Sequence, residues 1–253
     1  TAGVCIGRNE RMFIPKGETV TAPGPDGQPR TYRWDESLFW NVYYVKGAFL
    51  DADKAFEVIN GMRTVELRII NKCINTLVLA RALARHPAIN VRCSAVEGNE
   101  NFELRERLMF LGLPAPLFTL DFETELGASI GRDSFQRFFD CLEPAFGLQV
   151  SLGQVNTVVL CPALTSHSEL SGEALRQAGI SPTTIRVSVG EEDPRTLLAQ
   201  LMRAAELTLE PACRGFLGHF PAPDELDHLY ESTYVDVHRR YAASRPRMAR
   251  LME

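Results

Sequence analysis

Apolar residues between positions 53 and 85 recur every three or four residues, which is the spacing of one face of an α-helix. The residues that set this pattern are Phe56, Ile59, Met62, Ile69, Ile70, Cys73, Ile74, Leu77, Val78 and Leu83. The pattern predicts one long amphipathic helix or a broken pair, with Gly61 as the kink. His86 precedes Pro87, and the residue before a proline is driven out of the helical region, so the helix is expected to end there.

Helical and strand-like segments alternate further along the chain. We predict helices at residues 101–110 and 134–142, and strands at residues 117–122, 146–150 and 155–160. Alternation of this kind is typical of a mixed α/β layer. The fold class expected from the sequence is therefore α/β.

A further strand, residues 184–189, carries one arginine on its polar side. Because successive side chains alternate across a sheet, one side of the strand is formed by Ile185, Val187 and Val189. Arg186 lies on the other side, between Thr184 and Ser188. Gly190 ends the strand and Pro194 opens a helix. Periodicity alone favours a solvated arginine or half of an ion pair, and the alternative is a group that binds a carboxylate.

The ends of the chain have distinct compositions. Residues 3–7 predict a short buried strand, and residues 15–29, rich in Pro, Gly and Thr, predict a loop. Residues 33–46 are aromatic, which favours a packed core or subunit interface over a ligand-stacking cage. Residues 236–252 are rich in arginine and predict a helix within a C-terminal extension. We interpret this extension as a subunit contact or surface arm.

Composition excludes several classes of partner. The net charge of −5 over 253 residues, without a basic run between aromatics, gives no reason to expect nucleic acid or an anionic membrane. No apolar segment reaches membrane-spanning length and the first residues lack a signal-peptide pattern, so a cytoplasmic location is expected. The cysteines and histidines show no metal-ligand spacing, and buried, reduced thiols are expected rather than disulfides.

Five ordered motifs resemble one enzyme family. They are Ser151-Leu152-Gly153, a hydrophobic strand, a Pro162-Ala163 to Ser168 loop, a helix ending at Ala178-Gly179-Ile180, and the run from Arg186 to Asp193. Together they resemble the C-terminal part of the Cys/Met-metabolism family of pyridoxal-phosphate enzymes, which contains cystathionine synthases and lyases, methionine gamma-lyase and O-acylhomoserine sulfhydrylases. Residues 56–68, followed by His86-Pro87, resemble a helix of the same family. The resemblance is clear over residues 46–90 and 146–207.

The resemblance implies a fold and a set of boundaries. It implies the C-terminal portion of a fold-type I pyridoxal-phosphate transferase, with a long interdomain helix and a small, mainly antiparallel α+β domain. Residues 1–50 would be the last strand and loop of the large domain, and residues 51–90 the connecting helix. Residues 91–210 would be the small substrate domain and residues 211–253 an extension.

The resemblance also implies site residues. Arg186 would pair with the α-carboxylate of an amino-acid substrate, Ser151 would contact the same region, and Ser166 would line the pocket. The alternatives are a turn serine bonded to its own backbone at Ser151 and a helix cap at Ser166. His167 is interpreted as a structural residue that holds the loop. No residue of this chain is assigned to catalysis, cofactor binding or metal binding.

Pyridoxal-phosphate chemistry needs a lysine that forms a Schiff base with the cofactor. The lysines are Lys16, Lys46, Lys54 and Lys72, and none has the family's sequence context. Ala2-Gly3-Val4 resembles the strand that follows this lysine, so the lysine would lie upstream of Thr1. We therefore expect a partner, the N-terminal half that carries it, and a homo-oligomer such as a dimer or tetramer.

The expected activity is that of a pyridoxal-phosphate-dependent C–S lyase or gamma-replacement transferase. Its substrate would be a sulfur-containing or homoserine-derived L-amino acid, and beta-elimination also stays open. Two other hypotheses are kept: Thr1 as a processed N-terminal nucleophile of a hydrolase, and a non-catalytic scaffold subunit. A Ser-His-acid triad has no support, because Ser166, His167 and Ser168 are adjacent in sequence.

Overall fold

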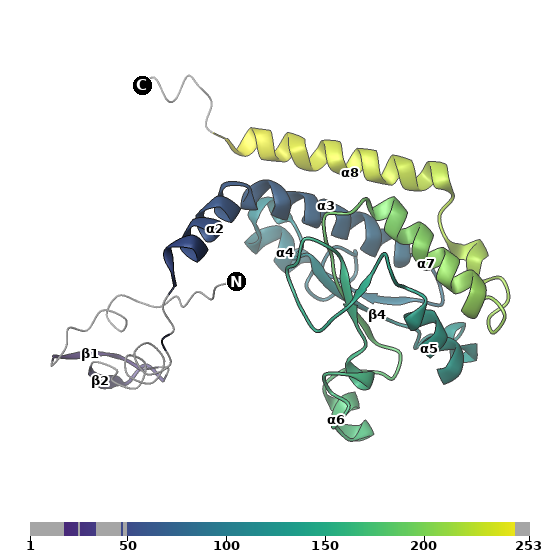
Figure 1. Ribbon diagram of the computed structural model, residues 1–253, viewed down its shortest axis with the longest axis horizontal. Coiled ribbons are helices and arrows are strands. Elements are labelled where there is room, and N and C mark those ends of the chain that lie inside the picture. Colours follow the sequence, from purple (N-terminus) through teal and green to yellow (C-terminus); the bar gives the residue numbers. More distant parts are fainter. Residues whose placement is uncertain (1–17, 25, 34–46, 48–49, 246–253) are drawn as a thin grey trace. The chain divides into compact units, whose positions relative to one another are not determined.

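The computed structural model describes residues 18–24, 26–33, 47 and 50–245. The chain divides into two compact units, Thr1–Val65 and Glu66–Glu253, which are drawn in Figure 1 and are described separately below. The predicted strand at residues 3–7, most of the aromatic segment at 33–46, and the residues Thr1, Lys16 and Lys46 lie outside the described part of the chain.

The first unit contains a hairpin and a helix. β1 (Thr19–Pro23) pairs antiparallel with β2 (Pro29–Arg33), and Gly27 in the connecting turn has a φ of 76°, which favours glycine. The sequence predicted only a loop over much of this segment. α2 (Ala52–Arg63) begins after Asp51, whose side chain accepts a 2.8 Å hydrogen bond from the Lys54 amide. None of the α2 residues is buried within the described structure.

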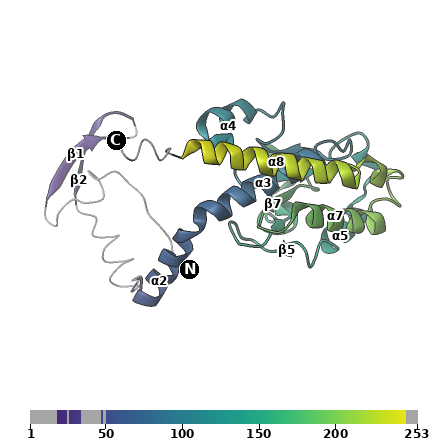
Figure 2. The same cartoon turned by 90° about the horizontal axis from the view of Figure 1, so that it is seen from above.

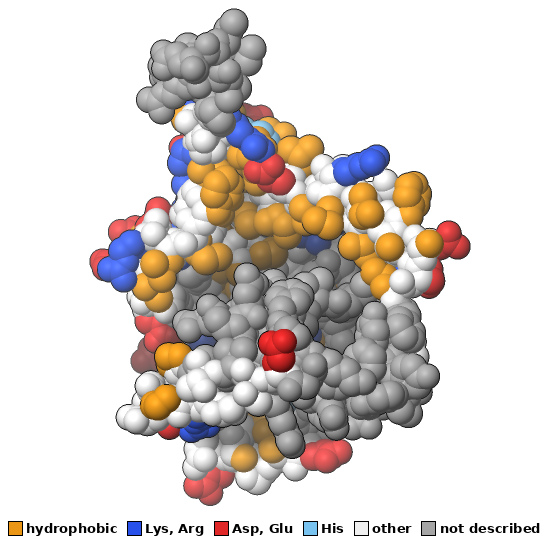
Figure 3. All heavy atoms as spheres, turned by 90° about the vertical axis from the view of Figure 1, so that its left-hand side faces the viewer, with side chains coloured by type: hydrophobic (Ala, Val, Ile, Leu, Met, Phe, Trp, Pro, Cys, Tyr) orange, Lys and Arg blue, Asp and Glu red, His pale blue; other side chains and the backbone are white. Residues whose placement is uncertain are grey.

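α3 (Val65–Leu83) is the central helix of the second unit. The predicted broken pair is confirmed, but the break lies at Thr64, the C-cap of α2, and not at Gly61. Gly61 is accommodated inside α2, although glycine costs about 1 kcal/mol relative to alanine in a helix interior. From Ile70 onward nearly every α3 residue is buried, while Leu67 and Ile69 in its first turns are exposed. Hydrophobic side chains also gather on the face drawn in Figure 3.

The second unit is built on a five-stranded sheet with the order β3-β4-β7-β6-β5. Its strands are β3 (Asn90–Arg92), β4 (Leu117–Asp121), β5 (Gly147–Leu148), β6 (Val158–Leu160) and β7 (Ile185–Ser188). All neighbouring strands are antiparallel except β5 and β6, which are parallel. The expected mixed α/β layer with a mainly antiparallel sheet is therefore confirmed.

α5 (Arg132–Asp140) and α7 (Pro194–Thr208) pack together with α3 against the sheet (Figures 1 and 2). The shorter helices α4 (Phe102–Leu108) and α6 (Gly172–Gln177) lie in connections between strands, and no residue of α6 is buried. All four helices are close to where the sequence predicts helices. One hydrophobic core joins α3, α5 and α7 to the sheet, with Leu77, Phe138 and Leu198 meeting Ile185 and Val187. This burial holds β7 in place from one side, because apolar area removed from water is the dominant stabilising contribution.

The C-terminal extension forms the short 3₁₀ segment η5 (Phe216–His219) and the long helix α8 (Pro223–Ser244). The helix predicted at residues 236–252 thus begins earlier, at Pro223, where the Glu225 carboxylate accepts a 3.0 Å hydrogen bond from the Ala222 amide. α8 runs along α3 and α7 in both ribbon views. The buried His86 side chain is hydrogen-bonded to η5, because its Nε2 lies 2.8 Å from the Phe216 carbonyl oxygen. None of the helices among the described residues is long and apolar enough to cross a bilayer.

Candidate functional site

Arg186 lies in the middle of β7, between β4 and β6. It pairs with Thr119 on one side and Leu160 on the other. Ile185 and Val187 point into the core, so Arg186 lies on the opposite face of the sheet, as the alternation predicts. The side chain is half-buried, which places its charge in a setting less polar than open solvent.

The guanidinium of Arg186 donates one hydrogen bond among the described residues and carries a buried Nε–H without a partner there. Its Nη2 donates a hydrogen bond to the carbonyl oxygen of Ser151 at 3.1 Å. Its Nε is buried and has no hydrogen-bond partner among the described residues. Within that part of the chain, the ion pairs join other arginines or Lys54 and do not include Arg186. A buried donor without a partner is costly, so this edge of the guanidinium fits an anionic acceptor from outside the chain.

Ser151 begins the turn that covers Arg186. Arg186 contacts the backbone carbonyl oxygen of Ser151 and not its hydroxyl. The sequence alone does not show which of these two groups makes the contact. The amide of Gly153, two residues on, donates to the Ser188 hydroxyl at 3.3 Å, and Gly153 has a φ of 73° that only glycine adopts readily. The structure thus brings Ser151 and Arg186 together, as the sequence hypothesis requires.

Ser166 lies in a separate, exposed turn between β6 and α6. Its hydroxyl shares a 2.8 Å hydrogen bond with Nδ1 of His167, its neighbour. No hydrogen bond among the described residues connects it to Arg186 or Ser151. The cap of α6 is Ser171, whose hydroxyl accepts from the Ala174 amide at 3.2 Å. The pocket-lining role of Ser166 therefore stays a prediction.

Lys72 belongs to the site and was missed by the sequence analysis. It lies on α3 and is 2% exposed, and its Nζ donates to the carbonyl oxygens of Gly153, at 3.4 Å, and Gln154. Burial lowers the pKa of the Lys72 ammonium, and the negative charge of Glu191 opposes that change. The available signal was a lysine inside the apolar run that surrounds Cys73 and Ile74.

The junction after β7 is fixed by side chains from α3 and by a carboxylate. The Asn75 side chain donates to the carbonyl oxygens of Gly190 at 3.1 Å and Glu192 at 2.8 Å. The Glu192 carboxylate accepts from the Thr157 amide at 2.6 Å and from the Thr157 hydroxyl at 2.8 Å. These bonds join the segment after β7 to α3 through Asn75 and to the start of β6 through Thr157.

Both lysines among the described residues contact other groups of the chain. Lys54 is exposed and pairs with Glu57 at 3.0 Å, and the Lys72 ammonium is occupied by two carbonyl oxygens. Neither lysine of the described part is placed to hold pyridoxal phosphate, so we assign no step of its chemistry to these residues.

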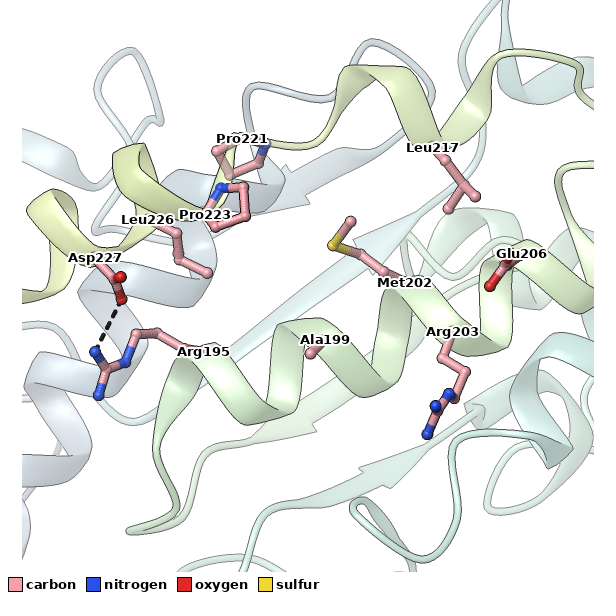
Figure 4. Close-up of a pocket in the computed structure, with 10 residues that line it drawn as sticks. All are labelled: Arg195, Ala199, Met202, Arg203, Glu206, Leu217, Pro221, Pro223, Leu226 and Asp227. Atoms are coloured by element: carbon pink, nitrogen blue, oxygen red, sulfur yellow. Dashed lines mark hydrogen bonds and ion pairs between the residues drawn. The ribbon is translucent and has the colours of Figure 1, made fainter.

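A cavity of about 460 Å³ lies between α7 and the C-terminal extension (Figure 4). Its apolar wall is formed by Ala199, Met202, Leu217, Pro221, Pro223 and Leu226. Arg195 and Asp227 close one end with a 2.9 Å ion pair. The cavity is built from other elements than the Arg186 site.

The fold and the Arg186 site together define an α/β domain with a candidate carboxylate-binding arginine. Comparison with known proteins identifies the family. Residues 28–206 match the model of the Cys/Met metabolism PLP-dependent enzymes, and the chain belongs to this family.

Individual relatives agree with this assignment. L-methionine gamma-lyase from Fusobacterium nucleatum is 27% identical over 175 residues, covering 68% of this chain and 42% of that protein. O-acetyl-L-homoserine sulfhydrylase 1 from Thermus thermophilus is 32% identical over 160 residues, covering 63% of this chain and 36% of that protein. The chain thus spans about two fifths of the length of these curated relatives.

Solved structures resemble the fold. A crystal structure of a putative O-acetylhomoserine (thiol)-lyase from Campylobacter jejuni matches with a TM-score of 0.59 and 26% identity, over 74% of this chain and 44% of that one. That structure carries N'-pyridoxyl-lysine-5'-monophosphate. A cystathione gamma lyase from Micromonospora echinospora matches with a TM-score of 0.55 and 28% identity, over 70% of this chain and 45% of that one.

Proposed function

We propose that this chain is the substrate-binding portion of a pyridoxal-phosphate-dependent enzyme that eliminates or replaces the γ-substituent of a sulfur-containing or homoserine-derived L-amino acid. One observation supports this most strongly. The guanidinium of Arg186 is tethered to the Ser151 carbonyl oxygen and keeps a buried Nε–H without a partner. An amino-acid α-carboxylate is the acceptor that suits this edge.

The physical argument rests on the geometry of arginine. A guanidinium presents parallel N–H groups that match the two oxygens of a carboxylate, and charge-assisted bonds of this kind are stronger than neutral ones. Because Arg186 is half-buried, solvent screens the pair less than it would on an open surface. Loss of such a desolvated pair costs about 2–4 kcal/mol of binding.

Two serines complete the proposed pocket. Ser151 lies beside Arg186 and would offer its hydroxyl to the carboxylate while its carbonyl oxygen holds the guanidinium. Ser166 would contact the remainder of the substrate from the exposed turn after β6. Both roles are inferred from the family resemblance of the surrounding motifs.

The cofactor lysine would come from sequence upstream of this chain or from another chain. The matched segment spans only 42% of the methionine gamma-lyase from Fusobacterium nucleatum, and neither described lysine is placed for the cofactor. Large exposed apolar side chains support a partner: Phe56, Ile59 and Met62 on α2, and Leu67 and Ile69 on α3. We propose that the N-terminal half of the fold covers these residues and that the assembly is a homo-oligomer.

The test uses the chain purified with the sequence or subunit that accompanies it. The wild-type assembly should show visible absorbance at about 420 nm from bound pyridoxal phosphate. Arg186→Ala should raise KM for L-methionine or O-acetyl-L-homoserine, whereas Arg137→Ala, an exposed arginine on α5, should not. Unchanged KM and kcat in Arg186→Ala would remove Arg186 from the carboxylate site.

A further inference from the structure

We propose that Lys72 is a positioning residue: it fixes the turn at residues 151–154, and through this turn it fixes the guanidinium of Arg186. The inference rests on the proposed function, because it concerns how the carboxylate site is kept in its binding geometry. It assigns a role to a lysine that has no place in the chemistry described above.

The contacts of Lys72 all point to this turn. Its side chain is 2% exposed, and its Nζ donates to two successive carbonyl oxygens, at Gly153 and Gln154. These carbonyls lie 81 and 82 residues further along the chain, so the lysine joins the central helix α3 to the turn. An ammonium group has three donors and no acceptor, which suits convergent carbonyl oxygens.

The turn at residues 151–154 also contacts β7 at two points. The Ser151 carbonyl oxygen accepts from Nη2 of Arg186 at 3.1 Å, and the Gly153 amide donates to the Ser188 hydroxyl at 3.3 Å. Gly153 therefore bonds α3 through its carbonyl and β7 through its amide. A shift of this one peptide segment would move the oxygen that holds Arg186.

A buried cation has a cost that an apolar residue at position 72 would avoid. Burial lowers the pKa of Lys72, and Glu191 and Glu192 supply opposing negative charge. An apolar side chain would continue the buried stripe of α3, but it would leave the Gly153 and Gln154 carbonyl oxygens without this donor. The two hydrogen bonds that Lys72 donates to the turn offset the cost of burying its ammonium group.

The expected consequence is a specific change in substrate binding. With Nη2 held by Ser151, the guanidinium keeps one orientation, and its Nε–H has no partner among the described residues. Without Lys72 the turn loosens and Arg186 samples other orientations, so carboxylate binding weakens while the reacting groups elsewhere are unaffected. KM should therefore rise more than kcat falls.

The experiment compares Lys72→Met, Lys72→Gln and Lys72→Arg in the complete assembly, with Lys54→Met as the matched control on the exposed face of α2. Lys72→Met should raise KM for L-methionine by about tenfold with kcat nearly unchanged, since small misplacements of a binding group have effects of this size or larger. Lys72→Arg, which keeps donors, should recover part of the loss. Amide hydrogen exchange at Gly153 and Gln154 should accelerate in Lys72→Met and not in Lys54→Met.

Two failures are distinguishable. If Arg186→Ala raises KM but Lys72→Met changes neither KM nor exchange in the turn, the positioning role is wrong and the proposed function stands. If Arg186→Ala itself leaves KM unchanged, the proposed function is wrong. If Lys72→Met does not fold, Lys72→Gln provides the same comparison, because it removes the charge and shortens the side chain that carries the donor. A KM for Lys72→Gln equal to that of the wild type would also overturn the inference.

Discussion

The side chain of Arg186 and the backbone carbonyl of Ser151 are joined by a 3.1 Å hydrogen bond, although the two residues lie 35 positions apart. This bond leaves the serine hydroxyl free of the tether and leaves Nε of the arginine without a partner in the described part of the chain. The arginine and the serine thus meet through a main-chain contact, and side-chain substitutions at the two positions should have different effects.

Ser151→Ala should be the milder of the two substitutions. The carbonyl tether survives the change, so only a neutral hydroxyl contact to substrate is lost, which costs about 1 kcal/mol. KM should rise a few-fold, measured by steady-state kinetics beside Arg186→Ala. A loss as large as that of Arg186→Ala would show that Ser151 does more than the structure indicates.

Glu192→Ala should destabilise the fold. The Glu192 carboxylate accepts two hydrogen bonds from the buried Thr157, and its removal leaves that amide and hydroxyl without their acceptor. The free energy of unfolding should fall by about 1–3 kcal/mol. Urea unfolding of the purified chain measures this, with Glu231→Ala on the exposed side of α8 as control. Equal stability of the two variants would contradict the role of Glu192.

His86 should make stability depend on pH. Burial lowers the pKa of His86 below its ordinary 6.5, and its Nδ1 accepts a 3.1 Å hydrogen bond from the Ala88 amide in the neutral form. The unfolded chain therefore binds more protons than the folded one below the unfolded pKa. The His86 contribution is complete above about pH 6.5 and is lost as pH falls through the lowered folded pKa.

Urea unfolding at several pH values checks this expectation. The wild type should lose stability as the pH falls below about 6.5, and His86→Gln should show a shallower dependence over the same range. Equal slopes for the two proteins would show that His86 does not bind its proton differently in the folded state.

Cys73 should resist alkylation in the folded chain. Burial raises the pKa of its thiol to about 11, so the reactive thiolate is scarce at neutral pH. Iodoacetamide labelling followed by mass spectrometry should modify the half-buried Cys141 before Cys73, and Cys73 should react readily only after denaturation. Early labelling of Cys73 in the native chain would contradict its burial on α3.

Local signals predicted much of this fold. The alternation around Arg186 placed it correctly on the face opposite the core, and the pattern of residues 53–85 predicted both helices. The position of their break was wrong, because a glycine inside a helix is tolerated when the flanking turns continue. The hairpin of β1 and β2 was read as a loop, since Pro and Gly dominate that segment.

The partners of the site residues were beyond sequence reasoning. Lys72 contacts carbonyls more than eighty residues away, and the Ser151 contact uses a backbone atom that every residue type carries. Long-range pairing of this kind depends on the tertiary path of the chain and leaves no periodic signal. Ser166 shows the opposite case, where a motif resemblance predicts a role that its own contacts do not yet support.

The most direct test of the account compares the dissociation constants of L-methionine and L-methioninamide, which differ in the carboxylate, for the assembled wild type and its Arg186→Ala variant. The wild type should prefer the carboxylate by about 2–4 kcal/mol, and the variant should lose most of that preference. The same preference in both proteins would contradict the assignment of Arg186 as the carboxylate-binding residue.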